Sequence, residues 1–213
     1  LIPMFFLIGS WGSRSRRIKA GFYFFIYTLV GSIFMLISIM IIFFEVGTTS
    51  ILLLDNYLFD FFTEKLLFLG FYLAFSTKIP MFPFHLWLPE AHVEAPTTGS
   101  VILAALLLKL GGYGFIRIGL LLLPKASVYF TPLVYTICII SLIYATLTTI
   151  RQIDLKKIIA YSSIVHMNLI VLGIFSMTLL GIQASVFLML AHGVVSSAMF
   201  FLIGMLYDRT KTR

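Results

Sequence analysis

Two lysines and two histidines stand inside apolar stretches of this sequence, where each could take up or release a proton. Lys109 lies within the stretch AALLLKLGGY, which holds no acid to pair with it, and Lys78 lies within FSTKIPMF. His166 and His192 lie in two later apolar stretches. Ionisable groups that follow one another through a membrane are what proton relays are made from, so the four together favour proton transfer.

Each of these side chains also has a purely structural interpretation. A lysine can donate to a carbonyl of a neighbouring helix, and a membrane histidine is as often a hydrogen-bond donor between helices as a proton carrier. The combination of four such residues on four different helices makes the relay the better hypothesis.

The composition identifies an integral membrane protein. Of the 213 residues, 61% are hydrophobic and 11% are charged, whereas soluble domains have roughly 25% charged residues. Stretches of about 20 apolar residues recur between short polar segments, and each is long enough to cross a hydrocarbon layer of about 30 Å as a helix. We therefore expect an all-α fold, a polytopic bundle of transmembrane helices that forms a single membrane domain.

The apolar stretches predict a series of spans, one of them interrupted. Residues 1–10 are apolar but cover only half a bilayer, so they are interpreted as the end of a helix that begins earlier. Because the first residue is Leu rather than Met, we expect a fragment of a longer protein, with a processed amino terminus as the alternative. The expected spans are residues 21–44, 66–92 (interrupted), 97–118, 131–150, 158–177 and 181–207.

Basic residues between the spans predict the orientation. Lysine and arginine concentrate in segments 14–19, 151–157 and 208–213, and threading the spans alternately places all three on one side, the inner side by the positive-inside rule. The acidic loop within 45–64 then lies outside. The net charge of +7 is explained by basic segments that face anionic lipid headgroups, so nucleic-acid binding is not expected.

Three prolines interrupt the span at 66–92. Pro80, Pro83 and Pro89 are each expected to remove a helix hydrogen bond, and a proline also disfavours helical geometry in the residue before it. The helix should break just after Lys78, whose charge would be stabilised beside the carbonyl end of the first half. Discontinuous helices of this kind build ion sites in transporters, although a kink made only for packing is the alternative.

Serines accompany both membrane histidines at helical spacing, which predicts a polar stripe on each of the two helices. Such stripes are suited to ordered water. The serines are Ser162 and Ser163 beside His166, and Ser185 and Ser196 beside His192.

A second polar group, formed by His85, Glu90, His92 and Glu94, surrounds the last proline. Histidines and carboxylates are metal ligands, but this spacing fits no standard motif, so a structural hinge is preferred and no metal site is expected. Cys138 is the only cysteine, which excludes an intrachain disulfide and a thiolate cluster within this chain. Motifs of soluble enzymes, such as a glycine-rich phosphate loop or a nucleophile elbow, are not found.

Three long blocks carry a family resemblance. They read FSTKIPMFPFHLWLPEAHVEAPTTGSVILAALLLKLGGYGFIRI (75–118), RQIDLKKIIAYSSIVHMNLI (151–170) and MLAHGVVSSAMFFLIGMLYDR (189–209). In order and length these blocks resemble the antiporter-like membrane subunits of respiratory complex I, the NADH:ubiquinone oxidoreductase, in their mitochondrial form. Subunits of cation/proton antiporters and of membrane-bound hydrogenases share this family, and the resemblance covers nearly the whole chain.

The resemblance implies a role for each of the four ionisable residues. Lys78 matches the family's lysine at the broken helix, and Lys109 matches the connecting lysine on the following helix. His166 and His192 match the histidines of the family's central polar axis. The family also uses a glutamate that would stand before LIPMFF and an ionisable exit residue on a later broken helix, and neither lies in this chain.

The resemblance further implies a proton-translocating membrane-arm subunit, flanked by two sister antiporter-like subunits and by lipid. Electrons would pass from NADH through FMN and iron–sulfur clusters to ubiquinone in other subunits of the enzyme, with no cofactor in this chain. The membrane would be the mitochondrial inner membrane, with the basic segments on the matrix side. A subunit of a cation/proton antiporter or of a membrane-bound hydrogenase is the alternative, and a passive membrane scaffold is a third possibility.

The orientation can be tested with protease. In sealed inner-membrane vesicles of either orientation, cleavage within 45–64 is expected only from the face opposite the matrix, because loops poor in basic residues are the ones translocated. Cleavage within 151–157 is expected only from the matrix face. The fragments are identified by mass spectrometry, and cleavage of the acidic loop from the matrix face alone would contradict this orientation.

Overall fold

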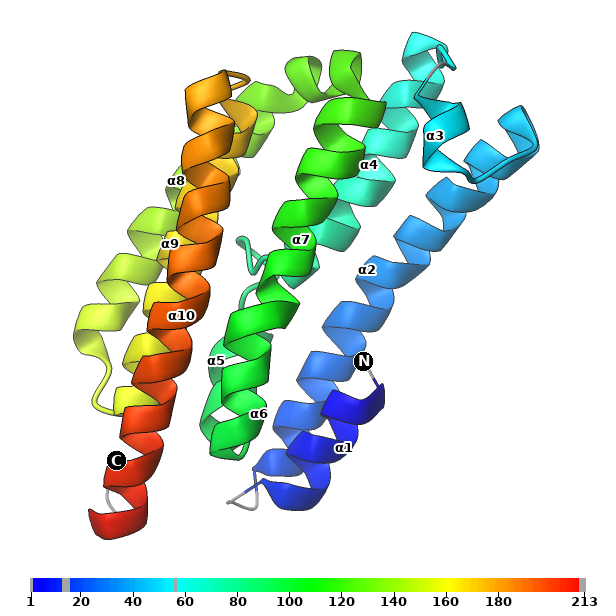
Figure 1. Ribbon diagram of the computed structural model, residues 1–213. Helices are drawn as coiled ribbons and strands as arrows, with labels where there is room; N and C mark the ends of the chain where they lie inside the picture. Colours follow the sequence, from blue (N-terminus) through cyan, green and yellow to red (C-terminus); the bar gives the residue numbers. More distant parts are fainter. Residues whose placement is uncertain (1, 13–15, 56, 211–213) are drawn as a thin grey trace.

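The computed structural model describes residues 2–12, 16–55 and 57–210, and within these ranges it is helical and contains no strand (Figure 1). The helices that are long and apolar enough to cross a membrane are α2 (Arg17–Val46), the helix Thr97–Leu120, α8 (Pro124–Arg151), α9 (Leu155–Phe175) and α10 (Leu179–Thr210). The expected polytopic all-α fold is thereby confirmed.

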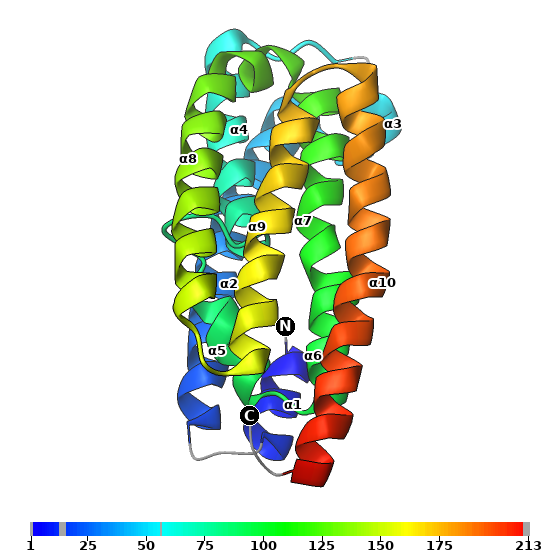
Figure 2. The same ribbon diagram turned by 90° about the vertical axis from the view of Figure 1, so that its left-hand side faces the viewer.

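The long helices run side by side along one common direction (Figures 1 and 2). Helix α9 packs between α8 and α10, and α2 packs against α4 (Phe61–Lys78) and the short α5 (Trp87–Glu94). Two further short helices are α1 (Ile2–Trp11), which packs on α2, and α3 (Ile51–Leu54). Most of α9 and α5 is buried, whereas α2, α8 and α10 expose much of their apolar surface, as lipid-facing helices do.

The helix that carries Lys78 is broken, as its prolines predict. Helix α4 ends at Lys78, residues 79–86 form turns, and α5 begins at Trp87. Ile79 adopts an extended conformation (φ −85°, ψ 107°), which a following proline favours. The expectation for Pro89 is wrong, because it lies in the first turn of α5, where backbone amides have no intrahelical partner to lose.

Groups within the break satisfy part of the backbone that the prolines leave open. The Ser76 carbonyl accepts a hydrogen bond from the Met81 N–H at 3.2 Å. The Thr77 carbonyl accepts one from the indole N–H of Trp87 at 2.9 Å. Trp87 therefore ties the start of α5 back to the end of α4.

Two neighbouring helices supply hydrogen-bond partners for two further backbone groups in the break. On α9 the Asn168 amide donates to the Pro80 carbonyl at 3.3 Å, and on α8 the Ser141 hydroxyl accepts from the Phe82 N–H at 2.8 Å. Asn168 and Ser141 are both buried. Backbone polar groups at membrane depth must be bonded within the protein, so these contacts allow the helix to be broken there.

The helix Thr97–Leu120 is continuous but not uniform. It begins as α6 (Thr97–Ile102), widens into the π-helical turn η1 (Leu103–Leu107), and continues as α7 (Leu108–Gly114) and a second π-helical turn, η2 (Phe115–Leu120). Apolar length predicts a regular span here and does not reveal the widened turns. Isolated π turns within α-helices often mark functional sites, and η1 ends just before Lys109.

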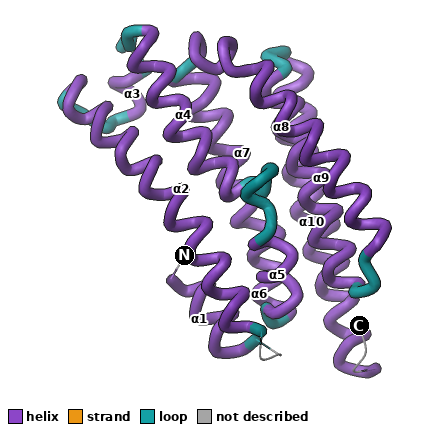
Figure 3. Tube along the Cα trace, turned by 180° about the vertical axis from the view of Figure 1, so that it is seen from behind, coloured by secondary structure: helices purple, strands orange, loops and turns teal. Residues whose placement is uncertain are grey.

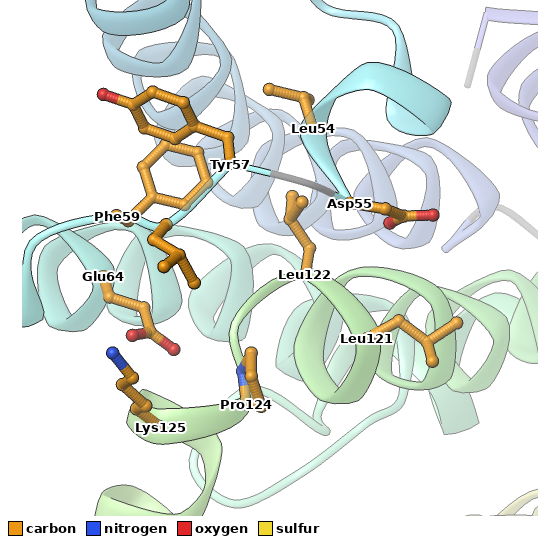
Figure 4. Close-up of a pocket in the computed structure, with 10 residues that line it drawn as sticks. Leu54, Asp55, Tyr57, Phe59, Glu64, Leu121, Leu122, Pro124 and Lys125 are labelled. Carbon is orange, nitrogen blue, oxygen red and sulfur yellow. The ribbon is translucent and has the colours of Figure 1, made fainter.

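Glu64, which the sequence places in the acidic outer loop, is buried in the structure. It is 3% exposed, and its Oε1 accepts a hydrogen bond from the Ala126 N–H at 3.0 Å. In Figure 4 its carboxylate points toward the beginning of α8, where Pro124 and Lys125 line the same pocket. The first amides of a helix lack intrahelical partners and attract negative charge, so Glu64 of α4 acts as a cap for α8.

Removing this cap is expected to destabilise the fold. Glu64→Ala leaves the Ala126 N–H without its partner, which costs about 1–2 kcal/mol by comparison with other N-terminal caps, whereas Glu64→Gln retains an acceptor oxygen and should lose less. The measurement is the thermal midpoint of the detergent-extracted assembly. Glu45→Ala, at an exposed acid near the end of α2, is the control. Equal midpoints for the two alanine variants would contradict the cap.

Candidate functional site

Lys109 and His192 meet between two membrane-spanning helices. Lys109 lies on α7 and His192 on α10, and the Lys109 Nζ and His192 Nδ1 atoms are 2.8 Å apart. His192 is 6% exposed. This distance is suitable for direct proton transfer between an amine and an imidazole. The sequence singles out both residues, but only the packing of α10 beside η1 brings them into contact.

The π-helical turn η1 gives the Lys109 amine a second partner, because the Ala104 carbonyl within that turn accepts a hydrogen bond from it. An ammonium group in hydrocarbon is costly without partners, so the carbonyl and the imidazole together make this position tolerable. When Lys109 is protonated, His192 Nδ1 accepts and the proton of the neutral ring is on Nε2. That Nε2 has no hydrogen-bond partner among the described residues.

His166 lies beside this pair, in a groove of about 140 Å³ between α9 and α10. Its ring centroid is 5.8 Å from that of His192, and its side chain is exposed in the groove. Three of the four serines in the two polar stripes line this groove. The fourth, Ser185, donates to the Gly181 carbonyl and does not line it. The serines that line it are Ser162, Ser163 and Ser196.

Lys78 faces a different cavity. Its side chain is partly exposed and lines a space of about 250 Å³ together with Thr28 and Ser32 of α2. In the described part of the chain no hydrogen bond joins Lys78 to Lys109, which donates to other groups. Any coupling between the two lysines is therefore electrostatic or passes through other groups. The other residues that line the cavity are Phe24, Trp87, Leu107 and Leu110.

His92, which the sequence assigns to a hinge, lies near the Lys109–His192 pair. It is 0% exposed on α5, and its ring stacks on Phe200 of α10 with centroids 4.5 Å apart. It is within electrostatic range of Lys156, His192 and Lys109. Neither ring nitrogen has a hydrogen-bond partner among the described residues. The sequence signal is a histidine in an apolar half-helix, but its neighbours depend on how α5 folds back into the bundle.

Lys156 is buried, although the sequence places it in a basic segment that faces lipid headgroups. It is 3% exposed, and its amine donates to the Ala95 carbonyl at 3.1 Å. That carbonyl stands at the C-terminal end of α5, which attracts positive charge. The expectation for the segment 151–157 is therefore wrong at Lys156, which turns into the protein.

The other members of the expected hinge cluster are dispersed. His85 is buried in the break, with its ring centroid 5.1 Å from that of Tyr144. Glu90 is half-buried and forms an ion pair with Lys157 at 3.6 Å, and Glu94 is buried. Within the described ranges no three histidine, cysteine or acidic side chains lie close enough to hold a metal ion.

Comparison with known proteins shows the family to which the chain belongs. The family described as NADH:quinone oxidoreductase/Mrp antiporter, transmembrane, matches residues 1–213. The chain belongs to this family. Among its members, the NADH-ubiquinone oxidoreductase chain 4 of Marchantia polymorpha is 59% identical over 213 residues, and that of Arabidopsis thaliana is 56% identical over 213 residues. Each alignment covers 100% of this chain and 43% of the relative, so the chain spans less than half the length of these relatives.

Solved structures show the same antiporter-like fold. A chain of the respiratory complex I from Thermus thermophilus with bound NADH matches with a TM-score of 0.91 at 33% identity, over 99% of this chain and 45% of that chain. A chain of the Mrp complex from Dietzia sp. DQ12-45-1b matches with a TM-score of 0.87 at 25% identity, over 100% of this chain and 23% of that chain. The resemblance that the three sequence blocks carry is thus confirmed at the level of family and fold.

Proposed function

We propose that this chain translocates protons as part of a membrane-arm subunit of an NADH:ubiquinone oxidoreductase, through a relay that contains Lys109, His192 and His166. The observation that carries the proposal is the 2.8 Å contact between an amine and an imidazole on two membrane-spanning helices. The relatives named NADH-ubiquinone oxidoreductase chain 4 support the choice of enzyme.

The interaction between the two histidines has the size that a pump needs. Two unit charges 5.8 Å apart, the distance between the ring centroids of His166 and His192, repel by about 3 kcal/mol at an effective dielectric constant of about 20. Moving one charge through 100 mV costs about 2.3 kcal/mol. A proton that arrives at one histidine can therefore expel a proton from the other site against a membrane potential of this order.

The inward branch of the relay runs through His92. This ring is within electrostatic range of Lys109 and of Lys156, and Lys156 belongs to the basic segment on the proposed matrix side. His92 thus links the Lys109–His192 pair to the inner surface. The groove beside His166 and its serines forms the neighbouring part of the path.

Lys78 acts as a separate charge at the end of α4. The carbonyl end of that half-helix stabilises its ammonium form, and the side chain lines a cavity that does not include Lys109. Lys78 influences Lys109 through its charge rather than through a shared hydrogen bond. Loading and emptying Lys78 would then bias the protonation of the Lys109–His192 pair.

The redox chemistry belongs to other subunits in this proposal. Electron transfer from NADH to ubiquinone, with FMN and iron–sulfur clusters, takes place outside this chain, which contributes no redox centre. Its partners are the other subunits of the complex, above all two sister antiporter-like subunits, together with lipid. Its place is the mitochondrial inner membrane, with the basic segments on the matrix side.

A cation/proton antiporter subunit is the second candidate, supported by the likeness to a chain of the Mrp complex. The same lysines would serve both functions. The assembled complex in sealed vesicles distinguishes them: proton flux driven by a sodium or potassium gradient without an electron donor favours the antiporter, whereas flux that requires NADH oxidation supports the respiratory subunit.

Substitution of Lys109 separates proton exchange from a fixed charge. Arginine keeps the positive charge but does not readily release its proton, and methionine removes the charge, so both should lower proton translocation through this chain by roughly twofold or more. The measurement is the number of protons translocated per NADH oxidised by the assembled complex in vesicles. Lys78→Met and Lys78→Arg should act in the same direction.

Lys125→Met, at an exposed lysine away from the relay, is the control for these variants and should leave the ratio unchanged. A normal proton-to-NADH ratio in fully assembled Lys109→Arg complexes would reduce the role of Lys109 to that of a fixed charge.

His92→Phe tests the inward branch. Phenylalanine keeps the aromatic stacking on Phe200 but removes both ring nitrogens, so the complex should assemble while proton translocation falls. Phe200→Leu is the matched control, because it removes the stacking and keeps the imidazole. It should lower the thermal midpoint more than the proton-to-NADH ratio. If His92→Phe translocates protons normally, His92 serves packing alone.

A further inference from the structure

A basic cavity lies between α2, α5 and α9, at the end of the bundle that carries the basic segments 16–19 and 151–157, and outside the proposed proton path. Its volume is about 450 Å³. Figure 3 shows α5, which contributes Glu90 to the cavity, between α2 and α9. The residues that line it are Arg16, Lys19, Tyr23, Leu86, Glu90 and Tyr161.

Positive charge predominates in this cavity. Glu90, the one acid among its lining residues, forms an ion pair with Lys157 at 3.6 Å. Arg16 and Lys19 are exposed, and neither forms an ion pair with a described residue. The Lys19 Nζ lies 5.5 Å from the centroid of the Tyr23 ring instead. The cavity therefore presents two cations that no acid in the described chain neutralises.

The basic residues at the cavity lie at or near the beginnings of membrane-spanning helices. Arg16 immediately precedes the first turn of α2, and Lys157 lies in the first turn of α9. Tyr23 and Tyr161 add aromatic rings with polar tips, which concentrate at membrane–water interfaces. We therefore expect the charged groups at the depth of lipid headgroups.

An apolar surface continues from the cavity toward the middle of the membrane. Tyr23, Ile26 and Val30 follow one another on α2 at spacings that place them on one face, and all three are exposed. Leu86 at the edge of the cavity and Phe82 in the break are exposed as well. In Figure 3 the break lies at mid-length, between α2 and the pair α8 and α9. Polar and apolar surfaces therefore follow each other in the order of a lipid headgroup and its tails.

We propose that the cavity binds the phosphate headgroup of an anionic phospholipid, whose acyl chains lie along α2 and across the break. The two cations that lack an acid favour a negatively charged headgroup over a zwitterionic one, and basic pockets between helices on the matrix side suit such headgroups. Arg16 and Lys19 both line the cavity, so a headgroup with two phosphates offers one phosphate to each.

Acyl chains are compatible with the broken backbone beneath them. They neither donate nor accept hydrogen bonds, so they can cover irregular backbone only where the protein itself satisfies it. Asn168 and Ser141 do this for the Pro80 carbonyl and the Phe82 N–H. The lipid site depends on the position of the chain in the membrane and is independent of the proton relay.

The test uses the intact assembled complex in detergent micelles and a diphosphatidylglycerol probe with a photoactivatable group on one acyl chain. Labelled peptides are identified by mass spectrometry, and label is expected on the peptides that contain Leu86 and Ile26. Unlabelled diphosphatidylglycerol should displace the probe. Phosphatidylcholine and inorganic phosphate should not.

Substitutions at the cavity should weaken binding of the probe in proportion to the positive charge that they remove. Arg16→Gln combined with Lys19→Gln is expected to weaken binding roughly 25-fold, which corresponds to about 1 kcal/mol for each basic residue. Arg151→Gln combined with Arg209→Gln removes the same charge from exposed positions on the same side, and should change binding by less than about twofold. Glu90→Gln should act in the opposite direction and strengthen binding, because it removes the acid from the cavity.

Equal labelling of the cavity variant and the matched control would overturn the proposal, as would equal displacement by phosphatidylcholine. Full displacement by inorganic phosphate would make this a phosphate site without a lipid. A chemical cross-link from Lys19 to a neighbouring subunit, with no label at Leu86, would show that protein fills the cavity. Native gels show whether each variant complex assembles. If the double variant does not assemble, Lys19→Gln alone is used in its place. That single variant is expected to bind the probe roughly fivefold more weakly.

Discussion

Hydrogen bonds to the backbone of the broken helix hold this structure together. In hydrocarbon an unpaired N–H or carbonyl costs several kcal/mol, so an interruption at that depth requires partners from the rest of the protein. Trp87 supplies one from the second half-helix, Asn168 supplies another from α9, and Ser141 supplies a third from α8. The break therefore joins α4, α5, α8 and α9 through hydrogen bonds.

The buried amines use main-chain carbonyls that a regular helix would not offer. Lys109 donates to the Ala104 carbonyl in the π-helical turn η1, and Lys156 donates to the Ala95 carbonyl at the end of α5. The break that follows Lys78 places this residue at the carbonyl end of α4. Helix ends leave carbonyls without intrahelical partners and attract positive charge. The irregular helices are thus what allows ionisable groups to stand at membrane depth.

Local patterns predict the features that depend on neighbouring residues in the chain. Long apolar stretches predict helices, because a helix satisfies its own backbone in a membrane. Pro80 predicts the end of α4, since it lacks an N–H and restricts the residue before it. Lys109 and His192 are recognisable because polar groups are conspicuous in apolar stretches. The turns η1 and η2 leave no comparable signal, and the partners of these side chains are set by contacts between helices.

The sequence by itself determined an all-helical membrane chain, a helix broken after Lys78, and the choice of Lys109 and His192 as candidates. Tertiary structure alone decided that Lys109 contacts His192, that Lys78 faces α2 instead, and that Glu64 and His92 are buried. The physical reason lies in the helices themselves. They are apolar on nearly every side, so hydrophobic periodicity does not distinguish the face that turns inward, and only the packing of one helix against another fixes it.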